Sequence, residues 1–264
     1  MEHAGRHALV TGGGTGIGLD IARALAAAGA EVTITGRDLG RLEAVAADTP
    51  RLHPLRMDVG EEASVRGGIA AAAKARGPVA ICVANAGIAE AAAFRDETLA
   101  HWRQIMATNL DGVFLTFQAA LATLEREEWA SAAQPRNEPW GRMIAISSIA
   151  GLMGLKNAIA YTASKHGVIG LVHGLSEEYM GGRVTFNAVC PGYVETPIVA
   201  RNAAEIAARQ GITEEEARAY LARGNRHKTL LQTDEVTGAV MWLCSDAARS
   251  VNGQSIQIAG GQVT

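Results

Sequence analysis

Short apolar segments alternate with longer segments of helical spacing along almost the whole chain. The apolar segments predict β-strands, because they are bounded by glycine, proline or polar residues. They cover His7–Thr11, Glu31–Thr35, Leu52–Met57, Val79–Ala84, Gly141–Ser147, Val184–Val189 and Ser255–Ile258. The helical segments cover Gly16–Gly29, Leu39–Asp48, Glu61–Arg76, Leu99–Glu127, Ala160–Met180 and Asp234–Cys244. Strands that are apolar on both faces, each followed by a helix, predict a parallel sheet covered on both sides.

This alternation predicts an α/β fold: a single doubly wound, Rossmann-type domain over residues 1–264 with a parallel sheet. A chain of 264 residues can bury a large core without a second domain. Two segments interrupt the pattern. Arg126–Trp140 is polar and is typical of an inserted surface loop, although a role in a subunit contact stays open. Thr196–Thr233 is helical in pattern and rich in Ala, Glu and Arg, and we expect it to form a substrate lid.

Composition argues against several classes of protein. The net charge of −3 gives no sign of nucleic-acid binding. No stretch approaches the roughly 20 consecutive apolar residues of a membrane span, and the first residues lack a signal-peptide pattern. Cys82, Cys190 and Cys244 show no metal-ligand spacing, so we expect buried thiols and no metal. The expected protein is cytoplasmic and acts on a small molecule, with no nucleic-acid or membrane partner.

A glycine-rich turn joins the first predicted strand to the first predicted helix. It runs Thr11-Gly12-Gly13-Gly14-Thr15-Gly16-Ile17-Gly18. Glycines let the backbone approach a pyrophosphate, and a helix N-terminus supplies unpaired N–H groups and a positive dipole. A plain flexible loop is the alternative, but the place of the turn between strand and helix favours a dinucleotide site. No lysine follows the glycines, which disfavours a P-loop ATPase or kinase.

The end of the second predicted strand bears on the choice of nicotinamide cofactor. Sites that prefer NAD usually place an acidic residue there, where it binds the ribose hydroxyls. Here the position is occupied by Gly36 instead of an acidic residue, and Arg37 can face a 2′-phosphate with its planar guanidinium. We therefore favour NADP(H), with NAD(H) possible. Two alternatives stay open: Arg37 as an ordinary solvated residue with Asp38 capping the next helix, or Asp38 binding the ribose.

Tyr161 and Lys165 lie four residues apart near the start of a predicted helix, so they share one face. A free tyrosine has a pKa near ~10, and a neighbouring ammonium favours the phenolate and lowers that pKa. Tyr161 is thus a candidate acid/base for a carbonyl or carbinol oxygen. Ser148, at the end of the preceding strand, is placed to hydrogen-bond the same oxygen. Asn109 lies within a long helix, where a polar side chain can perturb the helix and hold a water beside Lys165.

Taken together and in this order, the motifs resemble the short-chain dehydrogenase/reductase family of the ordinary soluble type. The matching motifs are Thr11–Gly18, Asp58-Val59, Asn85-Ala86-Gly87, Asn109, Ser148, Tyr161-x-x-x-Lys165 and Pro191-Gly192. The resemblance runs from about His7 to Gly261, nearly the whole chain.

The resemblance implies a role for each matching residue. Ser148 would orient and polarise the substrate oxygen, and Tyr161 would be the acid/base. Lys165 would lower the pKa of Tyr161 and bind the nicotinamide ribose, and Asn109 would keep a proton-relay water. With Arg37, the expected cofactor contacts are Gly12, Thr15, Gly16, Ile17, Gly18, Asp58, Val59, Asn85, Ala86, Gly87, Tyr161, Lys165, Pro191, Gly192, Val194 and Thr196.

Some of these contacts have more specific implied roles. Asp58 would hydrogen-bond the adenine amino group, and Asn85-Ala86-Gly87 would line the adenosine side and steady the central strand. The Pro191–Thr196 contacts would meet the nicotinamide end. The resemblance also implies a homotetramer packed through Leu99–Glu127 and Ala160–Met180. One departure stands out: many members place Pro-x-Gly-Arg after the lid, whereas this chain has Asn225-Arg226-His227-Lys228.

The expected substrate pocket is apolar, with walls at Ile149, Ala150, Met153, Leu155, Tyr193 and Ile198. The lid sequence is similar to those of hydroxybutyrate dehydrogenases and acyl ketoreductases. Ala89, Ala150 and Ala158 occupy places where a small hydroxy acid would need polar partners, which favours an apolar ketone or a 3-oxoacyl thioester.

These inferences give one leading functional hypothesis and two alternatives. The leading hypothesis is an NADP(H)-dependent oxidoreductase that interconverts a ketone and a secondary alcohol. An NAD-dependent 3-hydroxyacyl or cyclic or secondary alcohol dehydrogenase is the alternative. A non-catalytic nucleotide sensor is a remote one, disfavoured because Tyr161 and Lys165 are both present.

Overall fold

The computed structural model describes residues 2–124 and 141–262. Its seven strands form one sheet in the order β3-β2-β1-β4-β5-β6-β7, and every neighbouring pair is parallel. The strands are β1 (His7–Thr11), β2 (Glu31–Gly36), β3 (Leu52–Arg56), β4 (Val79–Ala84), β5 (Gly141–Ile146), β6 (Val184–Pro191) and β7 (Ser255–Ile258). The strand order reverses between β1 and β4, and that switch point is where ligands bind in sheets of this kind.

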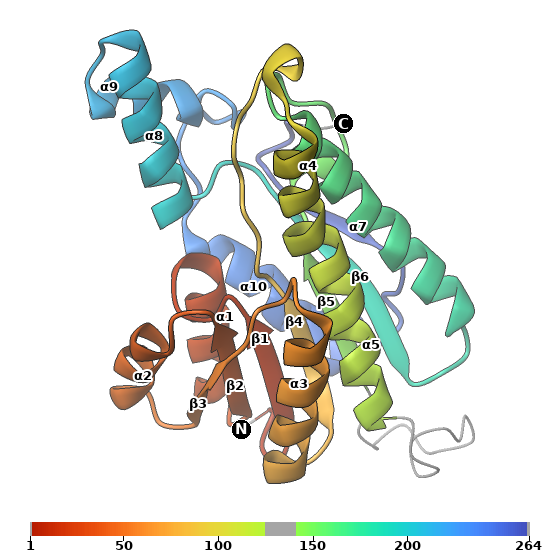
Figure 1. The fold of residues 1–264 in the computed structure, drawn as a ribbon. Helices are drawn as coiled ribbons and strands as arrows, with labels where there is room; N and C mark the ends of the chain where they lie inside the picture. The colour runs from red at the N-terminus through yellow and green to blue at the C-terminus, as the bar shows by residue number, and fades with distance from the viewer. Residues whose placement is uncertain (1, 125–140, 263–264) are drawn as a thin grey trace.

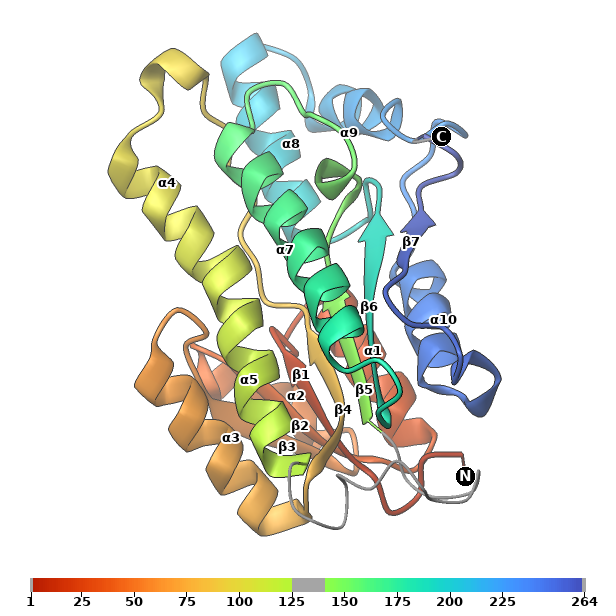
Figure 2. The ribbon, with the colours of Figure 1, turned by 90° about the vertical axis from the view of Figure 1, so that its right-hand side faces the viewer.

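Helices cover both faces of the sheet (Figures 1 and 2). One layer contains α1 (Gly16–Ala27), α2 (Leu39–Ala47) and α10 (Thr233–Cys244). The other contains α3 (Glu62–Arg76), α4 (Leu99–Met106), α5 (Gly112–Leu124) and α7 (Ile159–Glu178). The doubly wound fold expected from the alternation is confirmed.

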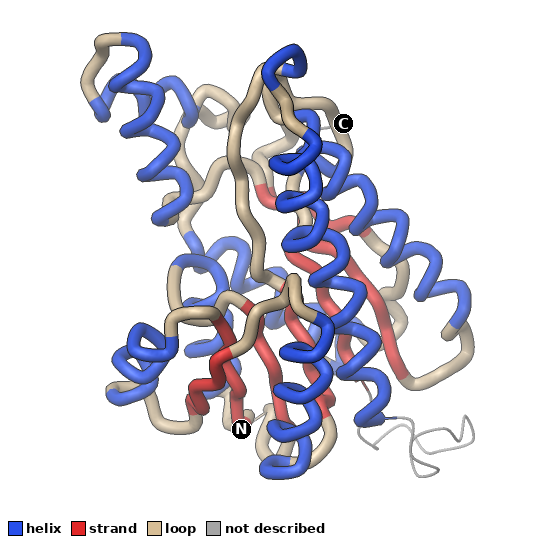
Figure 3. Tube along the Cα trace, in the orientation of Figure 1, coloured by secondary structure: helices blue, strands red, loops and turns tan. Residues whose placement is uncertain are grey.

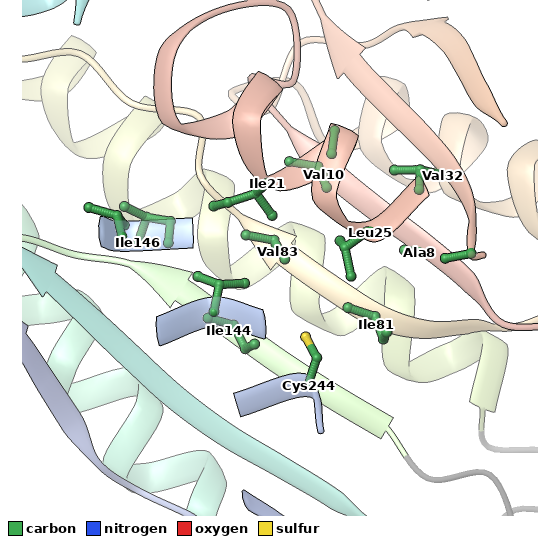
Figure 4. Packing of buried hydrophobic residues seen from close by; sticks show 14 of the residues in the cluster. Ala8, Val10, Ile21, Leu25, Val32, Ile81, Val83, Ile144, Ile146 and Cys244 are labelled. Carbon is green, nitrogen blue, oxygen red and sulfur yellow. The ribbon is translucent and has the colours of Figure 1, made fainter. Parts of the chain in front are cut away.

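Each helical layer closes a separate apolar core, because successive residues of a strand point to opposite faces of the sheet. Val10, Val83 and Ile144 face α1 and α10 and pack with Ile21 and other residues of that core (Figure 4). Leu9, Cys82 and Met143 belong to the opposite core, against α3, α5 and α7. The central strands β1, β4 and β5 are therefore buried at every position rather than at alternate ones.

The helix expected over Leu99–Glu127 is interrupted. A π turn at Ala107–Asp111 separates α4 from α5. Residues 125–127 of the expected helix lie outside the described part of the chain. By length and composition alone, Leu99–Leu124 is apolar enough to cross a membrane. Its α5 half packs on β4 and α3, and core helices of globular proteins pass the same test. The segment Arg126–Trp140, expected to be a surface loop, also lies outside the described residues.

Two further helices, α8 (Pro197–Gln210) and α9 (Glu214–Ala222), pack on each other apart from the sheet. They share a small apolar cluster of their own, formed around Val199, Ala203 and Leu221. The arrowheads of β6 and β7 point toward the end of the molecule that carries α8 and α9 (Figure 2). The long loop after β4 runs toward that same end (Figure 3). Both segments thus border the carboxyl ends of the strands.

Candidate active site

The glycine turn fits tightly against β4, which explains two of its glycines. A Cβ on Gly12 would lie 2.9 Å from Asn85 Nδ2, and one on Gly18 would lie 2.4 Å from the carbonyl oxygen of Gly12. Gly16 has a φ of 52°, in the left-handed region that favours glycine. Its open side faces Thr196 and Pro197, at 3.4 and 3.5 Å from a Cβ. The turn therefore meets the segment that follows β6.

Asn85 and Thr11 tie the ends of β1 and β4 together. The Thr11 hydroxyl accepts hydrogen bonds from the backbone N–H of Asn85 at 2.9 Å and of Ala86 at 3.0 Å. The Asn85 amide donates in return to the carbonyl oxygens of Thr11 and Gly12. These bonds fix the switch point of the sheet, directly beneath the glycine turn.

The N-terminus of α1 has the features of an anion site. Its N-cap residue, Thr15, makes no side-chain capping bond, whereas Asp38 caps α2 and Thr196 caps α8. Ile17 packs inward against the core. N–H groups in the first turn that no side chain satisfies remain available to a phosphate oxygen. The turn and the helix therefore fit the pyrophosphate of a dinucleotide.

Beside this turn, a cavity of about 470 Å³ lies at the carboxyl ends of β2 and β3. It is lined by Arg37, Arg56, Asp58, Glu61 and Ser64. Asp58 is oriented by its own loop: its Oδ1 accepts from Gly60 N at 3.0 Å, and its N–H donates to Ser64 Oγ. Its guanidinium groups can bind a phosphate, and the Asp58 carboxylate can accept a hydrogen bond from an amino group.

Asp38, the alternative partner of the ribose, caps a helix, and the side chain of Val59, an expected cofactor contact, lies in the core. Asp38 Oδ1 accepts from the backbone N–H of Arg41 at 3.1 Å, so this carboxylate caps α2. That arrangement disfavours the alternative in which Asp38 binds the ribose. The side chain of Val59 is buried and packs on Gly112, so it belongs to the core.

Ser148 and Tyr161 meet at the carboxyl end of β5. Ser148 begins the short helix Ile149–Gly151, where its Oγ accepts from Ala150 N at 3.1 Å. The Ser148 side chain also lies beside the Tyr161 phenol, and this neighbour works to lower the phenol pKa. Desolvation outweighs that effect and raises the pKa of Tyr161 above its ordinary value. The net pKa of Tyr161 is therefore not lowered in this structure, and the effect expected of the Lys165 ammonium stays a prediction.

Lys165 lies one helical turn after Tyr161 and is fully enclosed, with an exposed fraction of 4%. Its Nζ donates to the carbonyl oxygen of Ile146 at 2.8 Å and lies 5.7 Å from the centre of the Tyr161 ring. Burial lowers the Lys165 pKa to about 8. A Cβ on Gly87 would lie 3.7 Å from Nζ, so the end of β4 passes close by.

Asn109 occupies the middle of the π turn and is completely buried. Its Oδ1 accepts from Ile88 N at 2.9 Å, and its Nδ2 donates to Ile88 O and to Ser164 Oγ. The expectation that this side chain perturbs the long helix agrees with the π turn. Its amide, however, bonds to protein groups rather than standing free to hold a water.

The segment after β6 forms the opposite wall of the site. Gly192 packs against Asn225, and Val194 pairs with Leu231. Thr196 begins α8 and accepts from Val199 N at 3.3 Å. Pro191 ends β6, next to β7. The expected nicotinamide-side residues thus form one continuous wall that the Asn225 side chain braces.

A polar cavity lies beside the segment expected to form the lid. This second cavity, of about 400 Å³, lies between the loop after β4 and α8. It is lined by Glu90, Ala91, Ala92, Asp96, Thr98, His101, Arg201 and Glu205. Arg201 Nη2 donates to the carbonyl oxygen of Ala89 at 3.2 Å, so α8 reaches across to the loop. Of the expected apolar walls, Ile149 and Ala150 are buried, whereas Ile198 is 39% exposed.

Sequence reasoning missed several residues that shape this site. Arg56 and Ser64 line the cavity at the ends of β2 and β3, which we call the adenosine-side cavity after the role expected of Asp58. Only their closeness to Asp58 in the sequence could have indicated them. Ser147 Oγ donates to Lys165 O at 3.1 Å and so anchors α7 to β5. Asn225 hydrogen-bonds the backbone of Tyr193, in the segment after β6. In the sequence, Asn225 was notable only because its segment departs from a family pattern.

Comparisons with known proteins agree with this geometry. The family model described as short chain dehydrogenase matches residues 6–207. The chain is 34% identical to the D-beta-hydroxybutyrate dehydrogenase of Cupriavidus necator, over 98% of this chain and 98% of the relative. It is 30% identical to the 3-oxoacyl-(acyl-carrier-protein) reductase of Aquifex aeolicus, over 97% of each chain. A crystal structure of an actinorhodin polyketide ketoreductase variant with NADPH superposes with a TM-score of 0.89 at 30% identity, covering 99% of this chain and 98% of that one. The chain belongs to the short-chain dehydrogenase family.

Proposed function

We propose that the chain is an NADP(H)-dependent oxidoreductase that interconverts a ketone and a secondary alcohol, with an apolar ketone or a 3-oxoacyl thioester as substrate. One observation carries the proposal: the Ser148 side chain lies beside the Tyr161 phenol, one helical turn from the buried ammonium of Lys165. The relatives named above act on 3-hydroxy or 3-oxo groups by their names, which supports a substrate with an oxygen at that position.

The chemistry follows from the roles of the three side chains. NADP(H), when bound, supplies or accepts the hydride at the reacting carbon. Tyr161 donates its phenolic proton to the carbonyl oxygen during reduction and takes a proton from the carbinol during oxidation. Ser148 donates a hydrogen bond to the same oxygen. The positive charge of Lys165 stabilises the tyrosinate that forms when the proton leaves.

The pKa of Tyr161 lies above its ordinary value, so the phenol is protonated at neutral pH. It can therefore act as the proton donor when a ketone is reduced. The position of Arg37 beside the adenosine-side cavity favours NADP(H) as the cofactor.

The proposal extends to architecture. Residues 1–264 form one NAD(P)-binding domain, with residues 196–233 as a substrate lid that includes α8 and α9. The contact of Arg201 with Ala89 O and the salt bridge between Arg218 and Glu195 support a lid that rests on the loops around the site. The protein is proposed to be a cytoplasmic homotetramer. Phe114 on α5, 45% exposed, is an apolar residue that such packing would cover, and light scattering would measure the mass.

The activity is tested by following NADPH absorbance with a graded series of ketones and 3-oxoacyl thioesters. Tyr161→Phe removes only the phenolic hydroxyl, and we expect turnover to fall by about 10²- to 10⁴-fold with NADPH affinity unchanged. Tyr179→Phe, at the C-terminal end of α7 and outside the site and the lid, removes the same hydroxyl and is the matched control that should keep full turnover. Full turnover by Tyr161→Phe would refute the proposed mechanism. Tight NADPH binding without turnover of any substrate in the series would instead indicate a nucleotide sensor.

A further inference from the structure

The adenosine-side cavity contains a second guanidinium that comes from a different strand. Arg37 follows β2 directly, whereas Arg56 is the last residue of β3. In the parallel pairing of these strands, Arg56 lies opposite Gly36, and Met57 N donates to Gly36 O at 2.9 Å. The register therefore places Arg56 beside the residue that immediately precedes Arg37.

Gly36 leaves the space between the two arginines open. A Cβ at this position would touch only the Leu42 side chain, at 3.7 Å or more, which is ordinary van der Waals contact. The φ of Gly36 is not positive, so its backbone does not adopt the left-handed conformation. Packing thus does not require glycine here. What glycine provides is the absence of a side chain, including an acidic one, at the strand end beside the cavity that Arg37 and Arg56 both line.

The charges of the two arginines remain available to a ligand. Within residues 2–124 and 141–262, no salt bridge includes Arg37 or Arg56, although Asp58 and Glu61 line the same cavity. Arg41, the other arginine near the glycine turn, is paired with Asp38 at 3.7 Å. Its charge is partly compensated by that carboxylate, so it is the weaker candidate for an anion.

We propose that Arg56 is a second residue that binds the 2′-phosphate of NADP(H), opposite Arg37, and that it sets the preference for NADP(H) over NAD(H). This inference rests on the proposed function. A 2′-phosphate carries up to two negative charges and three oxygens, so it can accept bidentate hydrogen bonds from two guanidinium groups on different strands. NAD(H) has a hydroxyl at that position and gains nothing from Arg56.

The test is equilibrium binding, measured by titration calorimetry without substrate. The ligands are NADPH, NADH, 2′,5′-ADP and 5′-AMP, and the proteins are wild type, Arg56→Gln and Arg41→Gln. The expected loss for Arg56→Gln is roughly ten- to hundredfold for NADPH and 2′,5′-ADP, the range of a charge-assisted hydrogen bond. Affinities for NADH and 5′-AMP should stay within about twofold. The affinity of Arg56→Gln for NADPH should also fall less steeply with salt than that of wild type.

The control separates a specific contact from a general field of positive charge. Arg41→Gln removes the same charge from the same face and should leave the ratio of NADPH to NADH affinity unchanged. The proposal is overturned if Arg56→Gln leaves NADPH affinity intact, weakens NADPH and NADH equally, or matches Arg41→Gln. A failure of the cofactor assignment itself gives a different result, in which wild type binds NADH at least as tightly as NADPH.

Discussion

The ammonium of Lys165 donates a 2.8 Å hydrogen bond to the carbonyl oxygen of Ile146, the last residue of β5. This bond holds a buried charge that desolvation disfavours, and the pKa of Lys165 falls to about 8. The same backbone group thus fixes the cation one helical turn from Tyr161. The effect of this buried charge on the free energy of unfolding can be measured separately from its effect on turnover.

Lys165→Met is expected to lower turnover by about 10²- to 10⁴-fold and to change how stability depends on pH. The folded-state pKa of about 8 lies below the ordinary value of 10.5, so the unfolded chain binds more protons between these values. Wild type should therefore gain free energy of unfolding as pH rises from about 8 to 10.5, by about 3 kcal/mol from this group. Chemical denaturation at several pH values checks this, and an equal slope in both proteins would contradict it.

Asn225→Ala should weaken both the fold and the site. The fully buried Asn225 side chain accepts from Tyr193 N at 2.9 Å and donates to Tyr193 O and Thr229 O. Leaving these backbone groups unpaired should reduce the free energy of unfolding by about 2–3 kcal/mol and raise KM. Asn252→Ala, which removes bonds to Phe186 and Ser176 elsewhere, is the matched control. The control should lose stability without a change in KM, and parallel behaviour of the two variants would remove the assigned role of Asn225.

Lys228→Gly should stabilise the protein. Lys228 is exposed and has a φ of 59°, a backbone conformation that costs an L-residue roughly 1 kcal/mol. Glycine adopts it freely, so the gain should be about 1 kcal/mol in urea denaturation. Lys228→Ala keeps a Cβ and should gain nothing. A gain of the same size in both variants would point to the removed charge instead of the backbone.

His7→Gln should make the protein less sensitive to acid. The His7 ring is buried, with Nδ1 2.8 Å from Gly77 O and Nε2 2.9 Å from Thr33 Oγ1, which suits a neutral ring. Desolvation lowers its pKa below 6.5, so wild type loses stability as pH falls through 6.5 toward the folded-state pKa. A glutamine amide can keep one donor and one acceptor there without titrating. Thermal unfolding between about pH 7 and 5 should show the smaller decline in the variant, and identical declines would exclude His7 as the cause.

Much of the fold was predictable, because apolar strands and helical spacing are local properties of the sequence. The ends of β1 and β4 agree with the expected segments, and α7 differs from its expected range by one or two residues at each end. The π turn was not predictable. It depends on bonds from Asn109 to Ile88 and Ser164, which only the folded chain brings together.

The site shows the same division between local and tertiary information. The glycine turn and the Tyr161–Lys165 spacing can be recognised in the sequence, since each lies within a few residues. The pKa of Tyr161 depends on how deeply the phenol is buried, and spacing says nothing of that. Arg56 and Arg37 line one cavity only through the register of β2 and β3, and the charged second cavity forms where α8 meets the loop after β4.

Gly16 and Thr196 lie against each other although the first belongs to the earliest helix and the second opens α8. During synthesis, the glycine turn emerges long before the segment that faces it, and contacts of such sequence separation close late in folding. A ribosome-bound chain that stops before β6 would contain the glycine turn but would lack the segment that faces it. A cofactor that binds across this contact, as proposed, would bind only a chain in which both segments have assembled, and it would stabilise that folded form alone.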